Sequence, residues 1–224
     1  MVGGPQFTSL SSPSLPKPPE SGIGFLAGGF AEYKLSPLVS IRTGINFDRR
    51  SFSAAFQSAF LNFDTVTSYK SYFGYDLQYN VDYITLPLSI LYSKKAGKFG
   101  IILEGTFYYS IFLSANSKGY TNVYIHQDDL QYIDTEKYPD LKIGDNRTDL
   151  NGKTDYYLVK EPINSYDLGL NLYLGGSYYV SEKVNVSLLP GFASSFGHFL
   201  EDPRYDERWT RIFIIKTGIK YYLK

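Results

Sequence analysis

Residues 39–48, with the sequence VSIRTGINFD, alternate apolar and polar side chains at almost every position. Successive side chains of a β-strand point to opposite faces, so this pattern predicts a strand with one apolar and one polar face. Several other segments repeat the alternation. The connections between these segments are alternately very short and very long. This combination is typical of a membrane-spanning β-barrel with short turns at one end and long loops at the other.

The composition agrees with one all-β domain and excludes several classes of site. No break in composition divides the 224 residues, so we expect a single domain over 1–224. The 22 basic and 22 acidic residues balance, which gives no general attraction to nucleic acid. The chain has no cysteine, which excludes disulfides and thiolate chemistry. It also has no apolar run of about 18 residues, the length of a transmembrane helix.

Eight segments carry the pattern of a strand, and four long connections separate or follow them. The predicted fold is an eight-stranded antiparallel up-and-down transmembrane β-barrel. We expect long loops at 11–21, 53–75, 118–164 and 197–208, the third of which is an external loop rich in charged residues. The predicted strands are 2–10, 24–34, 39–52, 78–93, 98–114, 167–180, 184–196 and 209–223.

The polar faces of these strands decide between a membrane and water as the surroundings of the barrel. A soluble barrel needs many charges on its outer face, but the polar faces here hold mostly Gly, Ser, Thr, Asn and Tyr. Such a face suits a narrow interior, which leaves the apolar faces for lipid. Six tyrosines lie beside the short turns, where an interfacial aromatic girdle is expected: Tyr33, Tyr92, Tyr178, Tyr179, Tyr221 and Tyr222. A soluble ligand-binding barrel with inverted faces is the alternative.

Six stretches of the sequence share features with one known family: GGFAEYKLS (28–36), RTGI (42–45), YITLPL (83–88), the two glycine-containing strands around Gly105 and Gly175, and TGIKYYLK (217–224). They resemble the Bacteroidetes outer-membrane β-barrel family that includes the PorT-like proteins. The resemblance covers most of the chain from about residue 22 and implies an eight-stranded barrel in the outer membrane of a Gram-negative bacterium, with a secretion-accessory role as one version of its function. On this view a signal peptide or other upstream segment preceded Met1.

Four charged residues are predicted to point into the barrel. Glu32 and Arg42 lie on the polar faces of adjacent predicted strands, almost opposite one another across the turn at Ser36 and Pro37. Glu104 and Lys216 point inward by the same parity and can extend this pair into a network. We interpret the four as a structural plug that neutralises lumen charges, with a gate or proton path as the alternative. An interior filled by side chains is expected for eight strands.

The two histidines are the remaining candidates for chemistry. His126 has Asp128 and Asp129 nearby in the sequence, and His198 follows Ser194 and Ser195. Neither has the fixed partner and shaped pocket that catalysis needs, and the acidic loop lacks the spacing of a calcium loop. We therefore predict no enzymatic activity, no catalytic residue, no metal and no cofactor.

The predicted function is that of a structural or accessory membrane barrel. Its partners are membrane lipids and, through the external loops, a protein or surface ligand, but not nucleic acid. Two alternatives stay open: porin-like passage of small solutes, and a barrel lipid hydrolase or protease that uses the loop histidines.

Overall fold

A computed structural model covers residues 1–224. It describes residues 1–10, 20–58, 61–63, 66–68, 70–132, 140, 142–153, 157–158, 161–162, 164–196 and 210–222. The predicted loop at 197–208, with His198, lies outside the described residues, as does most of the predicted loop at 11–21. No helix among the described residues is long and apolar enough to cross a membrane.

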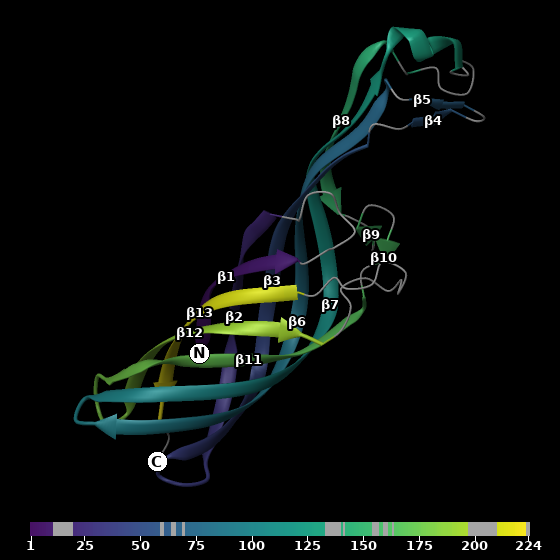
Figure 1. Ribbon diagram of the computed structural model, residues 1–224. Helices are drawn as coiled ribbons and strands as arrows, with labels where there is room; N and C mark the ends of the chain where they lie inside the picture. The colour runs from purple at the N-terminus through teal and green to yellow at the C-terminus, as the bar shows by residue number, and fades with distance from the viewer. Residues whose placement is uncertain are drawn as a thin grey trace.

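Eight antiparallel strands close into a ring, which confirms the predicted fold class. The strands of the ring follow one another in chain order, and each pairs with the next. The first strand, β1, also pairs with the last, β13, which closes the ring. Figure 1 shows the resulting barrel and its tilted strands. The ring consists of β1 (Val2–Leu10), β2 (Glu20–Lys34), β3 (Val39–Ser58), β6 (Tyr72–Ala96), β7 (Phe99–Ile125), β11 (Tyr166–Tyr179), β12 (Val184–Ser195) and β13 (Thr210–Tyr221).

Short turns close one end of the barrel. Ser36 Oγ accepts hydrogen bonds from the backbone N–H groups of Leu38 and Val39, and Ser181 Oγ does the same for Lys183 and Val184. Serine side chains commonly stabilise tight turns in this way. The two chain ends lie at this end too, since the Met1 amino group donates to the carbonyl of Ile219.

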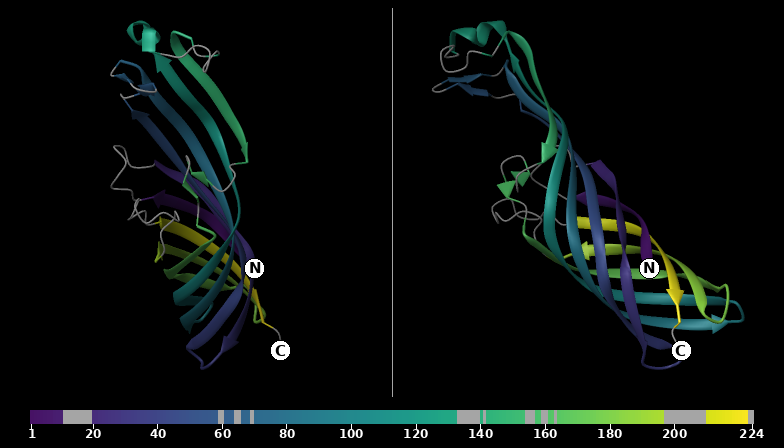
Figure 2. Two further views of the ribbon diagram at one scale, coloured as in Figure 1. Left: turned by 90° about the vertical axis from the view of Figure 1, so that its right-hand side faces the viewer. Right: turned by 180° about the vertical axis from the view of Figure 1, so that it is seen from behind.

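At the opposite end, three of the strands continue beyond the barrel as a sheet extension, visible at the top of Figure 1 and in both views of Figure 2. Its members are β8 (Gly144–Lys153) and the distal parts of β3, β6 and β7. The short helix η1 (Gln127–Tyr132) lies at its tip, and the small pairs β4 (Leu61–Phe63) with β5 (Val66–Ser68) and β9 (Tyr157–Leu158) with β10 (Glu161–Pro162) lie in the connections.

The extension corrects two predictions. Residues 53–75 and 118–164 were expected to be loops, but parts of both form strands of this sheet. The pair Asn151 and Gly152, typical of a turn, lies inside β8. The alternation predicts strands only where one face meets an apolar medium and the other a polar one. Residues 118–125 and 144–153 of this sheet do not alternate in this way, so they lack that signal.

Apolar side chains form a small core where the sheet extension meets the barrel. Phe52 and Tyr79 stack with their ring centroids 5.4 Å apart, and Tyr83 meets Phe112 edge to face at 6.1 Å. Val81 and Ala115 are buried in the same cluster. This core joins the extension to the barrel rim. Burial of such side chains contributes roughly 1.5–3 kcal/mol each.

Two irregularities occur in β6. The register to β7 shifts between Asp82 and Tyr83, so that Ser114 and Phe112 oppose these neighbours and Leu113 is the extra residue of a bulge. Pro87 lies farther along β6, and a proline inside a strand often marks a bulge. The register around Pro87 does not shift, and the paired positions of β3 stop at Thr43 and resume at Asn46 opposite it. Proline has no N–H to donate, which accounts for this local gap.

The barrel wall separates polar side chains inside from apolar side chains outside. On the outer face Ile90, Leu172 and Phe192 are 65%, 61% and 69% exposed, although they lie within strands of the ring. Inside, Arg50, Glu104 and Ser110 are almost completely buried. This is the reverse of a soluble barrel, in which apolar residues fill the interior.

Candidate functional site

The lumen contains two clusters of charged side chains, one above the other. The first, called the lower cluster, lies toward the short turns and consists of Glu32, Arg42, Glu104, Lys216 and Lys220. Arg42 bonds Glu32 at 2.8 Å and Glu104 at 2.9 Å. Lys216 Nζ lies 2.7 Å from Glu104, and Lys220 Nζ lies 2.6 Å from Glu32. All four predicted residues therefore meet in one network.

Neutral groups complete the lower cluster. Ser89 and Thr106 donate to Glu104 Oε1 at 2.9 and 3.1 Å, while Arg42 and Lys216 occupy Oε2. The Lys216 ammonium lies 3.8 Å from the ring centroid of Tyr173. Buried charges are costly unless they are both paired and hydrogen-bonded, and Glu104 meets both conditions.

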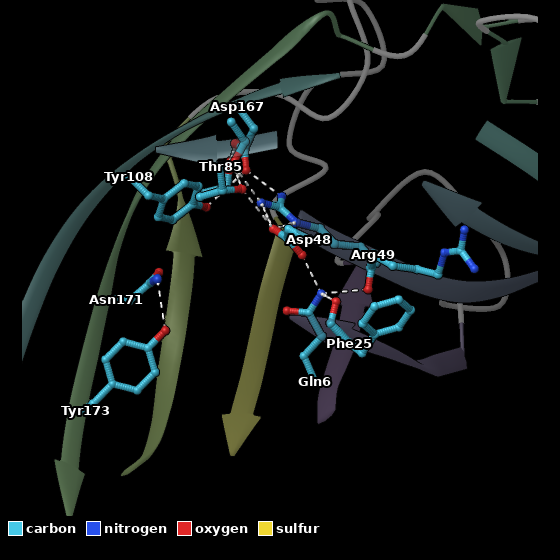
Figure 3. A network of polar contacts seen from close by, with 12 residues as sticks. Gln6, Phe25, Asp48, Arg49, Thr85, Tyr108, Asp167, Asn171 and Tyr173 are labelled. Carbon is cyan, nitrogen blue, oxygen red and sulfur yellow. Dashed lines mark hydrogen bonds and ion pairs between the residues drawn. The ribbon is translucent and has the colours of Figure 1, made fainter. Parts of the chain in front are cut away.

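The second cluster, the upper cluster, lies toward the sheet extension and centres on Arg50. Its guanidinium bonds Asp48 on the same strand at 3.0 Å and Asp167 on β11 at 2.5 Å. Figure 3 shows Asp48, Thr85, Tyr108 and Asp167 gathered at this point. The Tyr108 hydroxyl donates to Asp167 at 3.0 Å, and Ser195 donates to the other oxygen of that carboxylate.

Sequence reasoning did not select the upper cluster, although a signal was present. Arg50 has the same parity on β3 as Arg42 and Asp48, and alternation places all of them on one face. The partner Asp167 is 117 residues away from Arg50, and no local pattern links the two. Lys220, four residues after Lys216 on β13, was missed although its parity is also inward.

The charges of the lumen balance as a whole but not within each cluster. The lower cluster has three cations and two carboxylates, whereas the upper has one cation and two carboxylates. Each cluster thus carries a net charge opposite to that of the other. The ion pairs within each cluster hold these side chains in place across the lumen. They also link the strands that carry them.

A cavity of about 40 Å³ lies between the clusters. Its lining includes Gln6, Asn46 and Asn171, and each has a buried side-chain oxygen without a hydrogen-bond partner among the described residues. A water molecule needs roughly 10–15 Å³ of such space and two to four polar partners. The cavity therefore suits a few water molecules and is too small for a continuous solute path.

One ion pair lies on the outside of the wall. Arg49 points outward from β3 and bonds Asp82 through two hydrogen bonds of 2.7 and 2.8 Å. Ser114, beside the bulge, donates to Asp82 at 3.3 Å. The Arg49 guanidinium also lies 5.6 Å from the ring centroid of Phe25. This pair lies near the base of the sheet extension.

His126, one of the two histidine candidates in the sequence, lies just before η1 at the tip of the sheet extension. Nδ1 of His126 accepts a hydrogen bond from the backbone N–H of Asp128 at 3.2 Å. Asp129 accepts from both the backbone and the hydroxyl of Ser71, which ties η1 to the start of β6. Lys70 pairs with Asp128, and this contact raises the pKa of Lys70 and lowers that of Asp128. Within the described residues, no group of three or more His, Cys, Asp or Glu could hold a metal ion.

No family model and no curated protein matches the chain. Solved structures with a similar fold include Neisserial surface protein A, at 11% identity and a TM-score of 0.46, covering 99% of this chain and 95% of that one. The attachment invasion locus protein Ail of Yersinia pestis has 8% identity and a TM-score of 0.37, with 98% and 95% covered. An outer membrane channel from Pseudomonas putida F1 has 8% identity and a TM-score of 0.23, with 99% and 94% covered.

Proposed function

We propose that this protein is an integral barrel of a Gram-negative outer membrane, closed through its centre, with an external sheet that binds a partner. We propose that it is not an enzyme. The observation that carries the membrane assignment is the outer belt of exposed apolar side chains around a charged interior. Monomeric soluble proteins rarely expose contiguous apolar patches beyond a few hundred Å². Around the wall of this barrel, the exposed side chains are mainly Ile, Leu and Phe.

The two borders of the belt support a membrane-spanning position. Near the short turns Tyr33 and Tyr221 are 73% and 60% exposed, and aromatic side chains of this kind occur at membrane interfaces. Toward the other border the outer wall carries an ion pair, Arg49 with Asp82. The sheet extension then lies in water outside the cell, and the short turns face the periplasm.

A closed barrel follows from the two lumen clusters. Side chains of five strands meet in the middle, and about 40 Å³ stays open between them. We therefore propose a structural role for Glu32, Arg42, Glu104 and Lys216, and we place the porin-like alternative second. A channel would require these buried ion pairs to open, which costs several kcal/mol for each uncompensated charge.

The sheet extension is the proposed binding surface. One of its faces presents Asp76, Gln78 and Lys118, which are exposed. Arg147 lies over the ring of Tyr120, 3.9 Å from its centroid. Tyr72 and Tyr124 stack at 4.9 Å. Tyrosine and arginine are common in protein interfaces, so we infer a protein partner. A PorT-like accessory role in secretion is one version of this function and stays a prediction.

Cell fractionation tests the membrane assignment. The full-length protein should be found in the outer-membrane fraction and migrate differently on gels before and after heating, as a folded barrel does. Full solubility without detergent would overturn the assignment.

A deletion tests the role of the extension. Asn116 and Lys153 are direct cross-strand partners, so residues 116–153 can be replaced by a two-residue turn at their base. The shortened barrel should keep its heat-modifiable migration and lose cross-linking to the partner. Retained cross-linking by a folded deletion variant would assign the binding to another part of the chain.

A further inference from the structure

An apolar groove of about 780 Å³ lies on the outer wall of the barrel. It crosses β6, β7, β11 and β12, and its sides are formed by Ile90, Phe107, Leu172 and Phe192. Its volume falls within the range of roughly 300–1,000 Å³ that small-molecule sites occupy.

Gly105 is one of the residues that line this groove. It pairs with Ile90 on one side and with Leu172 on the other, so all three occupy one row of outward positions. A Cβ placed on Gly105 would meet no atom within 4 Å. The row therefore has a gap at Gly105, between the large apolar side chains of Ile90 and Leu172. An acyl chain can fill such a gap in van der Waals contact with both sides.

A cation lies at the end of the groove nearer the sheet extension. Arg211 on β13 lines the groove and pairs with Ser194 of β12, and that serine opposes Leu170 of β11. Its side chain is exposed on the outer face. Within the part of the chain that the structure describes, no carboxylate forms an ion pair with Arg211.

Arg49 provides a comparison at a similar level of the wall. Both arginines point outward near the end of the barrel from which the sheet extends. Arg49 is neutralised by two hydrogen bonds to Asp82, whereas Arg211 has a groove beside it and no such partner among the described residues. A cation above an apolar groove fits an amphiphile with a negative head and a hydrocarbon tail.

We propose that this groove is a site for an anionic membrane lipid, with one acyl chain over Gly105 and the phosphate of the headgroup at Arg211. The inference rests on the membrane-spanning barrel proposed above. It adds a specific lipid to the general contact that any barrel makes with its bilayer, and it places that lipid in the leaflet on the side of the sheet extension.

Two variants and a matched control test the apolar gap and the cation of this site separately. Gly105→Leu fills the gap and Arg211→Gln removes the cation. Gly29→Leu is the control, because Gly29 lies on β2 with its missing Cβ also in open space and is not part of the groove. Each protein is reconstituted into nanodiscs of equal parts phosphatidylglycerol and phosphatidylcholine with the same acyl chains. Lipids retained by the released barrel are counted by native mass spectrometry.

The wild type and Gly29→Leu should retain one phosphatidylglycerol in about fivefold preference to phosphatidylcholine, the factor expected for one cation near an anionic surface. Arg211→Gln should lose the preference, and Gly105→Leu should lose the retained lipid. Equal retention of both lipids by the wild type would overturn the proposal, as would identical results for Gly105→Leu and Gly29→Leu. A lipid-free dimer would assign the groove to a second copy of the chain. Failure to enter nanodiscs would refute the barrel proposal itself, and this inference with it.

Discussion

Arg42 and Glu104 meet across the lumen with Nη1 and Oε2 2.9 Å apart, although 62 residues separate them in the chain. Glu32 holds the other side of the same guanidinium. The contact joins β3 to β7, which lie on either side of β6 in the sheet. Among the described residues these two strands share no backbone hydrogen bonds, so the side chains link them through the lumen.

We expect Arg42→Ala to destabilise the folded barrel by about 3–5 kcal/mol, because it leaves two buried carboxylates with one cation fewer. Denaturant unfolding in detergent micelles measures this change. The double variant Arg42→Met with Glu32→Met removes one charge of each sign and should recover part of the loss. Arg147→Ala, which breaks an exposed pair with Asp149 on the extension, is the control and should cost below about 0.5 kcal/mol. Equal effects of Arg42→Ala and the control would contradict a stabilising lumen network.

The wild-type barrel should show no large, stable conductance in planar lipid bilayers, because side chains leave about 40 Å³ open between the clusters. Replacing Arg42 and Arg50 together by serine should give small currents selective for cations, since the carboxylates of the lumen remain. A clear open-pore current from the wild type would show that the lumen is not closed, whatever the variant does.

Single cysteines can test the orientation, because the natural chain has none. Lys118→Cys on the extension should react with a membrane-impermeant maleimide in intact cells. Lys183→Cys in a short turn should react only after the outer membrane is permeabilised. Leu88→Cys on the apolar belt should stay protected in both conditions. Labelling of Lys183→Cys in intact cells would reverse the orientation, and labelling of Leu88→Cys would argue for a barrel surrounded by water.

The Lys70–Asp128 contact at the tip should persist over a wide range of pH. Asp128 has a lowered pKa, so the contact is complete above the usual value of 3.8 and is lost as the pH falls through the lowered one. Lys70 has a raised pKa, so the contact is complete below the usual value of 10.5 and is lost as the pH rises through the raised one. A carboxyl titration by NMR should give a midpoint for Asp128 below 3.8 that moves upward in Lys70→Met. An unchanged midpoint would show that the two side chains do not pair in solution.

The barrel could be predicted from the sequence because the alternation of apolar and polar residues shows that the two faces of a strand lie in different surroundings. Residues 39–48 show this well: Ile41 and Phe47 lie on the outer face, and Arg42 and Asp48 lie in the lumen. Strand parity also placed Glu32, Glu104 and Lys216 inside. The same rule fails for part of the sheet extension, because both faces of a strand can be polar where water surrounds the proposed external sheet. Its strands at residues 118–125 and 144–153 therefore look like loops in the sequence.

By itself, the sequence determined which side of each barrel strand faces inward and how many strands there are, because the two-residue period of a strand is a local property. Only the tertiary structure decided which inward groups meet. Arg50 reaches Asp167 because β3 and β11 face each other across the closed ring, and Gly105 becomes the floor of a groove because Ile90 and Leu172 flank it on separate strands. Such contacts depend on register and closure, which are set by the whole ring of strands together.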